Sequence, residues 1–328
     1  MKILVTGANG FLASNVIREL NKRGHQVRAL VRATADLSAL NGADYELFRG
    51  NMVNMIDAED AVTGCDVVIH AAADTSQHYR SFEPLMQTNY QATLNLLEAS
   101  GKHHIKRFIF ISTANTLGHG TRKNPGNETN PVKYPFSHAP YAISKMKAQE
   151  LVQDYGLTAK LNTVVVNPTF MIGPYDTKPS SGRILLMMYG RRFVFIPPGG
   201  KNFIHVGDAS IAICNAIQNG KSGSCYLLAN ENLTYSEFFE KLKKTTGQKS
   251  LKILLPGWFL SLLGDIGNLI SYAGIRSDLN SINAEILRTG NYYTGLKAVH
   301  ELNMPQTPVE TAIKDAMQWF RENGYLKP

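Results

Sequence analysis

The arrangement of short apolar runs constrains the fold of this 328-residue chain more than any other feature. Runs rich in β-branched and aromatic residues, each bounded by turn-forming residues, lie at 2–6, 27–31, 66–70, 107–112 and 163–167. Uninterrupted apolar runs are typical of strands buried on both faces, as in a parallel sheet covered by helices. The first half of the chain therefore predicts an α/β fold built on a doubly wound parallel sheet.

The segment between the first two runs has a helical pattern. Leu12, Val16 and Leu20 recur four residues apart, and Gly24 closes the pattern. This spacing places the three side chains on one face and predicts an amphipathic helix that packs on the sheet.

The pattern changes after residue 168. Loop-rich segments precede helical windows near 234–245, 256–273, 278–288 and 308–323. We expect the sheet domain to occupy residues 1–168, with later returns of the chain to it at about 200–230. Residues 169–328 are then mainly a smaller, mostly helical lobe, and the gap between the two parts is the expected place for a substrate.

Cysteine and charge content restrict the class of protein. Cys65, Cys214 and Cys225 are too few and too scattered for a disulfide framework or a metal-ligand cluster, so we expect a reduced, cytoplasmic protein without metal. The N-terminal "MKILVTG" reads as a first strand and not as a secretory signal. The formal net charge of +8 is spread along the chain, so no nucleic-acid partner is expected.

One segment, 254–275, is apolar enough to raise the question of a membrane. It contains Pro256, Asp265 and Asn268, and a charged side chain costs roughly 2.5 to 3.5 kcal/mol near the centre of a bilayer. We expect a buried helix here, or one that covers an apolar cleft, and no membrane partner.

The turn after the first strand points to a ligand. Gly7 and Gly10 stand between that strand and the first helix, where the backbone must turn tightly and approach a pyrophosphate held at the helix N-terminus. Ala13 replaces the usual third glycine and still allows close packing of helix on strand. The N-terminal domain is therefore predicted to be a nucleotide-binding domain of the Rossmann type.

The end of the second strand bears on the choice of nucleotide. An acidic residue there binds the ribose 2′-hydroxyl of NAD, whereas arginine suits the 2′-phosphate of NADP. The sequence reads "VRALVRAT", with Val31 and Arg32 and no acid within reach. NADP(H) is therefore favoured over NAD(H).

With these residues, the chain resembles the extended short-chain dehydrogenase/reductases over nearly all of its length. It looks most like their dihydroflavonol-reductase-like branch, which shades into hydroxysteroid dehydrogenases and sugar epimerases. The matching segments, in the family's order, are "TGANGFLA", "VRALVRAT", "DVVIHAAA", "TNYQATLNLL", "FIFISTANTLG", "PYAISK", "VVVNPTFMIGP" and "FIHVGD".

The resemblance implies roles for particular residues. Thr113, Tyr141 and Lys145 would be catalytic, and Asn89 matches an asparagine that is more often structural. The residues implied for the cofactor are Gly7, Asn9, Gly10, Phe11, Leu12, Arg32, Asn51, Met52, Ala71, Ala72, Ala73, Tyr141, Lys145, Asn167, Pro168 and Thr169. Ser112 and the loops 74–84 and 176–188 supply the candidate substrate contacts, which are Ser112, Gln77, His78, Tyr79 and Arg183.

The spacing of Tyr141 and Lys145 has a chemical reason. Hydride transfer at a carbon that bears oxygen needs a proton to move on that oxygen, and a tyrosine with its ordinary pKa of about 10 is a poor base at neutral pH. An ammonium one helical turn away would lower the pKa of the tyrosine, and Thr113 can hydrogen-bond the substrate oxygen. Together with the resemblance, these residues predict an NADP(H)-dependent carbonyl reductase or alcohol dehydrogenase. The apolar and aromatic residues of 184–196 and 254–275 favour a small apolar or aromatic substrate.

Other functions remain open. Related sugar-nucleotide dehydratases place an Asp-Glu pair after the catalytic threonine, and this chain has Ala114 and Asn115 there, which disfavours dehydration. An NAD-dependent sugar or nucleotide-sugar epimerase can use the same tyrosine. A non-catalytic nucleotide-sensing or RNA-associated scaffold is a third reading. By resemblance, helices near 81–100 and 140–155 would form a homodimer.

Overall fold

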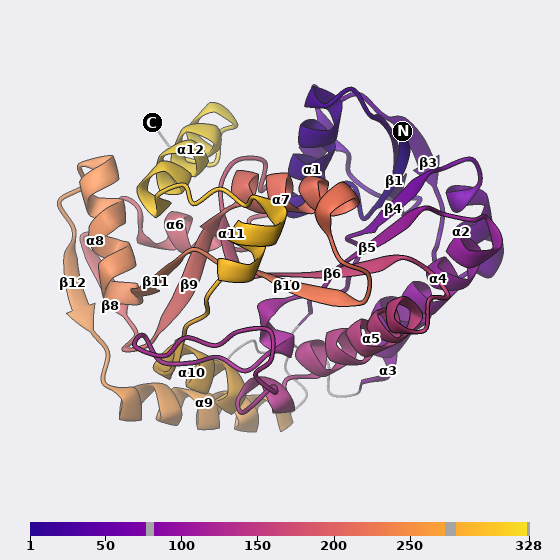
Figure 1. Cartoon of the computed structure of the whole chain (residues 1–328). Coiled ribbons are helices and arrows are strands. Elements are labelled where there is room, and N and C mark those ends of the chain that lie inside the picture. Colours follow the sequence, from indigo (N-terminus) through magenta and orange to yellow (C-terminus); the bar gives the residue numbers. More distant parts are fainter. Residues whose placement is uncertain (77–81, 273–279, 327–328) are drawn as a thin grey trace.

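A seven-stranded parallel sheet forms the centre of the larger part of the molecule (Figure 1). The computed structural model describes residues 1–76, 82–272 and 280–326. The strand order is β10-β6-β5-β4-β1-β2-β3, and every neighbouring pair is parallel. The strands are β1 (Lys2–Thr6), β2 (Gln26–Val31), β3 (Glu46–Arg49), β4 (Val67–His70), β5 (Arg107–Ile111), β6 (Thr163–Pro168) and β10 (Ser224–Leu228). The predicted doubly wound Rossmann-type fold is confirmed.

Helices cover both faces of this sheet. Along β1, Ile3 and Val5 belong to the apolar core on one face, and Leu4 belongs to the core on the other. This burial on both faces explains why the strands read as uninterrupted apolar runs. The helices on the first face are α1 (Phe11–Lys22), α7 (Val206–Asn219) and α11 (Leu296–Leu302), and those on the second are α2 (Met55–Val62), α4 (Ala92–Lys102) and α5 (Pro140–Leu157).

The smaller lobe contains two small sheets as well as the helices that the sequence predicted. In the first, β9 (Gly200–His205) pairs with β7 (Phe170–Ile172), β11 (Glu231–Thr234) and β13 (Gly290–Asn291). In the second, β8 (Phe193–Ile196) pairs with β12 (Leu251–Leu254). The helices are α6 (Arg183–Met188), α8 (Tyr235–Thr246), α9 (Gly257–Tyr272), α10 (Ser281–Arg288) and α12 (Val309–Glu322). Between β4 and α4, in the larger part, lie α3 (Glu83–Leu85) and a π-helical turn, Met86–Gln91.

Helix α9 is only partly buried, so the expectation of a buried helix is wrong, and the alternative that it covers an apolar cleft stays a prediction. Its inner face packs closely on α10, because a methyl group at Gly264 would stand 2.8 Å from Cβ of Ala284. Several large apolar side chains lie on the outer face, where Trp258 is 69% exposed and Leu269 is 71% exposed, whereas Leu260 is buried. Within the described residues, no helix is long and apolar enough to cross a membrane.

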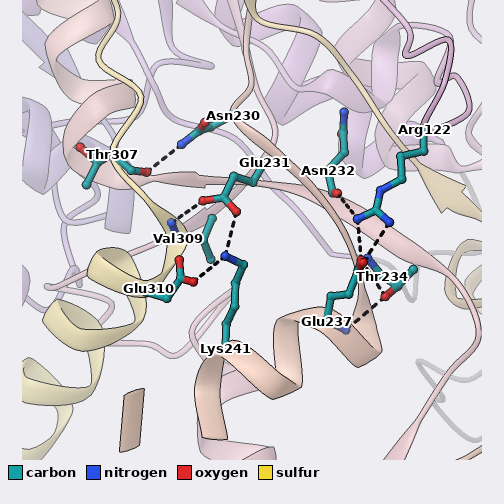
Figure 2. Close-up of polar contacts among 10 residues, drawn as sticks. All are labelled: Arg122, Asn230, Glu231, Asn232, Thr234, Glu237, Lys241, Thr307, Val309 and Glu310. Atoms are coloured by element: carbon teal, nitrogen blue, oxygen red, sulfur yellow. Dashed lines mark hydrogen bonds and ion pairs between the residues drawn. The ribbon is translucent and has the colours of Figure 1, made fainter. Parts of the chain in front are cut away.

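Polar contacts tie the loop after β5 to the smaller lobe (Figure 2). The guanidinium of Arg122 donates to both carboxylate oxygens of Glu237 in α8, at 2.9 and 2.6 Å. Glu237 also accepts from the backbone N–H of Thr234 at 2.8 Å, which caps the start of α8. Lys241 then links Glu231 of β11 to Glu310 of α12, at 3.1 and 2.6 Å. The Arg122 contact joins the loop after β5 to the smaller lobe, and the Lys241 contacts join α8, β11 and α12 within that lobe.

Candidate active site

A cavity of about 1070 Å³ lies at the carboxyl ends of the central strands and is closed on its other side by β7, β9 and β13 of the smaller lobe. It brings together residues from segments far apart in the sequence. The predicted site residues that line it are Gly7, Asn9, Gly10, Phe11, Leu12, Arg32, Met52, Ala71, Ala72, Ala73, Ser112, Thr113, Tyr141, Lys145, Pro168 and Thr169.

The turn between β1 and α1 fits a pyrophosphate. Gly7 has a positive φ of 62°, and a Cβ there would stand 2.7 Å from Cα of Ala72, so only glycine fits. The N–H of Gly10 donates to the carbonyl of Gly7 at 2.8 Å, which closes the turn. The first turn of α1 carries no acidic side chain, so its N–H groups and positive end can receive an anion.

The end of β2 carries positive charge. Arg32 is exposed and lines the cavity, and Nη1 of Arg49 donates to the carbonyl of Arg32 at 3.3 Å. Two guanidinium groups therefore lie at this loop. Among the residues that the structure describes, the acidic side chains lining the cavity are Asp74 and Asp176, and neither belongs to β2.

The two residues predicted to flank the adenine, Asn51 and Met52, lie differently, and the contact of Asn51 stays a prediction. Asn51 is exposed and lies outside the cavity, whereas its neighbour Met52 is buried and lines it. The reason is local, because the N–H of Asn51 donates to a carboxylate oxygen of Asp57 at 2.7 Å and its side chain accepts from the N–H of Val53 at 3.2 Å.

Asn89 holds the segment that follows β4. Its side-chain Oδ1 accepts from the N–H of Asp74 at 2.8 Å, and its Nδ2 donates to the carbonyl of Asp74 at 3.0 Å. The same Nδ2 donates to Oγ of Ser144 in α5 at 2.9 Å. Asn89 thus fixes the backbone next to Ala71–Ala73 against the helix that carries Tyr141, the structural role suggested by its sequence position.

Tyr141 and Lys145 lie one turn apart at the start of α5, and both line the cavity. Burial raises the pKa of Tyr141 to about 12, and a hydrogen bond with the Thr113 side chain opposes this increase. In the protein alone, Lys145 does not lower the pKa of Tyr141, although the sequence predicted that it would. Tyr141 is therefore protonated at neutral pH, in the state needed to donate a proton.

Lys145 is fully buried and has its own partners. Its ammonium donates to the carbonyl of Ile111 at 2.7 Å and lies 3.9 Å from the centre of the Phe110 ring. Burial lowers the pKa of Lys145 to about 7. Its charge therefore depends on the groups that surround it in the complete site.

A buried hydrogen-bond network lies beneath these residues. Oε1 of Gln149 accepts from Oγ of Ser112 at 2.7 Å and from Nδ2 of Asn167 at 2.8 Å. Nδ2 of Asn167 also donates to the carbonyl of Thr113 at 3.1 Å. Asn167 is fully buried and supports the backbone of Thr113 without lining the cavity itself, so its predicted place near the nicotinamide stays a prediction. Ser112 does line the cavity, although its hydroxyl is already engaged.

The remaining predicted substrate contacts are Arg183, Gln77, His78 and Tyr79. Arg183 is exposed at the start of α6 and does not line the cavity, so its role as a substrate contact stays a prediction. Gln77, His78 and Tyr79 lie outside the described residues. The structure adds cavity-lining residues that the sequence reasoning missed, chiefly Asn115, Phe136, Phe170, Met171, Lys201, Asn202 and Tyr293. Most come from the smaller lobe.

The glycine turn, the basic loop and the tyrosine-lysine pair define a dinucleotide-dependent enzyme site on a Rossmann-type fold. The model of the NAD dependent epimerase/dehydratase family matches residues 3–229. The chain belongs to this family, the extended short-chain dehydrogenase/reductases, which are NAD(P)-dependent enzymes.

Individual relatives span most of the chain. A protein of Synechocystis sp., whose name places it provisionally among dihydroflavonol 4-reductases, is 30% identical over 98% of this chain and 95% of its own length. A sterol-4-alpha-carboxylate 3-dehydrogenase (decarboxylating) of Dictyostelium discoideum is 27% identical over 81% of this chain and 86% of its own. The crystal structure of gox2253 has a TM-score of 0.86, is 29% identical and covers 99% of both chains.

Proposed function

We propose that this chain is an NADP(H)-dependent carbonyl reductase or alcohol dehydrogenase that acts on a small apolar or aromatic substrate. The observation that carries the proposal is the placement of Tyr141, Thr113 and Lys145 on the wall of the cavity that also holds the glycine turn. A protonated tyrosine beside a threonine hydroxyl is suited to deliver a proton to a carbonyl oxygen.

Tyr141, Thr113 and Lys145 have different roles in the reaction. When bound, the nicotinamide supplies or accepts the hydride at the substrate carbon. Tyr141 gives its proton to the carbonyl oxygen during reduction and takes one back during oxidation, while the Thr113 hydroxyl donates a hydrogen bond to the same oxygen. A positively charged Lys145 favours the tyrosinate that results from reduction.

Preference for NADP(H) rests on the loop after β2. Arg32 and Arg49 both lie there, and guanidinium groups bind phosphate in a bidentate manner. The acidic side chain that would bind an unphosphorylated ribose is missing from β2 and from the described cavity wall beside it.

An apolar substrate is supported by the wall contributed by the smaller lobe. Phe170, Met171 and Tyr293 line the cavity beyond the catalytic residues, and Phe136 adds an aromatic ring from the loop before α5. The relative from Dictyostelium is named for a sterol substrate, which is also mostly apolar.

Epimerisation is the second candidate, because the family includes epimerases and the same tyrosine serves both reactions. Dehydration has less support, since Ala114 and Asn115 follow Thr113 where a carboxylate pair would be needed. A non-catalytic nucleotide-sensing or RNA-associated scaffold is the third candidate, and the retained Tyr141 and Lys145 speak against it.

Isotope transfer tests the proposal against these alternatives. The protein is incubated with NADPH deuterated at C4 and a panel of aliphatic and aromatic ketones. We expect deuterium on the carbinol carbon of the product, with one NADPH consumed for each alcohol formed. A tightly bound NAD that never exchanges, with inversion of a sugar and no net nucleotide oxidation, would establish the epimerase instead. RNA binding without turnover would establish the scaffold.

Assembly and location are also proposed. Helices α4 and α5 contact one another on one side of the sheet, and by resemblance they would form the core of a homodimer. Sedimentation of a monomer at micromolar concentration would refute the dimer. Cys65, Cys214 and Cys225 are all free thiols, which agrees with a cytoplasmic protein.

A further inference from the structure

Lys201 is a cavity-lining lysine whose position the proposed reaction does not explain. It lies on β9 and pairs with Leu233 of β11 on one side and with Asn291 of β13 on the other. Its backbone is therefore held within the smaller sheet. Its side chain lines the main cavity and also an adjoining space of about 160 Å³, whose wall includes Tyr141 and Asn115. Lys201 thus stands at the reacting end of the cavity.

Among the residues that the structure describes, none accepts a hydrogen bond from the ammonium of Lys201. Over residues 1–76, 82–272 and 280–326 it makes no hydrogen bond and no ion pair, and its contact is the Phe170 ring, whose centre lies 4.9 Å away. Lys145 by contrast donates to a carbonyl, and Lys241 binds two carboxylates. Burial lowers the pKa of Lys201 to about 8, so the charged form still predominates at neutral pH.

The acidic side chains of the cavity do not neutralise Lys201. The carboxylate of Asp176 accepts from the N–H groups of Ser180 and Gly182, each at 2.9 Å. The carboxylate of Asp74 accepts from the N–H of Ser76 at 2.9 Å and lies on the segment after β4. A partly buried ammonium with no acceptor is unfavourable, and an anionic ligand removes that penalty.

We infer that the substrate carries a carboxylate on the same end as its reacting carbon, and that Lys201 binds this carboxylate while Tyr141 faces the carbonyl or hydroxyl oxygen. One ligand can reach both side chains, because Lys201 and Tyr141 line the adjoining space of about 160 Å³ as well as the main cavity. The substrate class is therefore an oxo acid or hydroxy acid with an apolar remainder. This inference rests on the proposed reductase function and specifies its substrate.

A matched pair of compounds tests the assignment. Benzoylacetate and its methyl ester share the ketone and the ring, and only the acid carries a charge. For the unmodified protein we expect kcat/KM with NADPH to be on the order of 10- to 100-fold higher for the acid. Lys201→Met should remove this preference with little effect on the ester, and Lys201→Arg should retain part of it. Lys178→Met, which removes another lysine from the same cavity, should leave the preference unchanged.

A binding measurement keeps this test separate from the proposed reaction. Calorimetry with 3-hydroxy-3-phenylpropanoate and NADP⁺ is run on the protein and on Lys201→Met. Lys201-dependent binding without any turnover would uphold the carboxylate site and refute the reductase. Turnover with equal or greater activity on the ester would uphold the reductase and overturn the carboxylate site. Lack of acid binding up to about 10 mM, or equal binding by Lys201→Met, would also overturn it.

Discussion

The ammonium of Lys145 donates a 2.7 Å hydrogen bond to the carbonyl of Ile111, the last residue of β5. This bond joins the first turns of α5 to the strand end that leads into Thr113. Tyr141 lies one turn before Lys145 on the same helix, so the bond sets the position of the tyrosine relative to the threonine. It also leaves a charged group buried, which has a measurable effect on stability.

Substitution of Lys145 should change how stability depends on pH. The pKa of Lys145 is about 7 in the folded protein and about 10.4 in an unfolded chain. Between these values the unfolded state binds more protons, so this group makes the free energy of unfolding rise with pH, and its penalty is fully present below pH 7. In urea denaturation, the unfolding free energy of the protein minus that of Lys145→Met should rise by about 2 kcal/mol from pH 7 to pH 9.

Lys147 provides the control for this prediction. It is exposed on the same helix, and the difference between the protein and Lys147→Met should be constant over that range. A difference for Lys145→Met that also stays constant would show that the ammonium is not desolvated as the structure indicates.

Arg32 should govern the choice of nucleotide. Loss of a charge-assisted contact to the 2′-phosphate should raise the Kd for NADPH by about 10- to 100-fold in Arg32→Ser. The Kd for NADH should change by no more than about twofold, because that nucleotide lacks the phosphate. Fluorescence titration measures both. Arg23→Ser removes the same charge from the far end of α1 and should affect neither, whereas equal weakening of both nucleotides by Arg32→Ser would count against a phosphate contact.

The turn at Gly7 should not tolerate a methyl group. In Gly7→Ala the new Cβ would meet Cα of Ala72 at 2.7 Å in a backbone with positive φ. We therefore expect the free energy of unfolding and the free energy of nucleotide binding each to weaken by about 1 to 3 kcal/mol. Gly24→Ala is the matched control, since Gly24 also has a positive φ and has nothing within 4 Å of the new Cβ. Thermal denaturation and nucleotide titration should separate the two variants. Normal nucleotide affinity in Gly7→Ala would contradict the assigned pyrophosphate turn.

The contacts of Lys241 should stabilise the smaller lobe. Its ammonium bridges Glu231 and Glu310, and all three side chains are partly exposed, so Lys241→Met should cost about 1 kcal/mol in urea denaturation. Lys243 lies two residues away and reaches Glu240 only at 4.0 Å, so Lys243→Met should stay within about 0.5 kcal/mol of the unmodified protein. Equal effects of the two substitutions would argue against a stabilising role for the bridge.

The central strands could be predicted because burial on both faces leaves an uninterrupted apolar run. β3 escaped prediction since it lies at the edge of the sheet, where Leu47 is 41% exposed and the apolar run disappears. The burial of helix α9 was predicted wrongly for a related reason. It is apolar on most sides, so composition could not distinguish a buried helix from one whose outer face, with Trp258 and Leu269, is exposed.

The residues of the candidate site also differ in whether the sequence could predict them. Gly7 and Gly10 were identifiable because a tight turn before a helix is a local requirement. Asn51 and Met52 are neighbours, and only the direction taken by the loop decided which one lines the cavity. Lys201 was missed because its neighbour in the site, Tyr141, lies 60 residues earlier in the sequence. The two residues come to line one space only in the folded chain.

The central claim is that Tyr141 exchanges a proton with the substrate oxygen. The most direct measurement is the rate of NADPH oxidation by Tyr141→Phe in a single turnover with the best ketone of the panel. The rate should fall by about 10²- to 10⁴-fold while the Kd for NADPH stays within about twofold, because the phenyl ring keeps the packing and lacks the proton. A rate within about tenfold of the unmodified protein would contradict the claim.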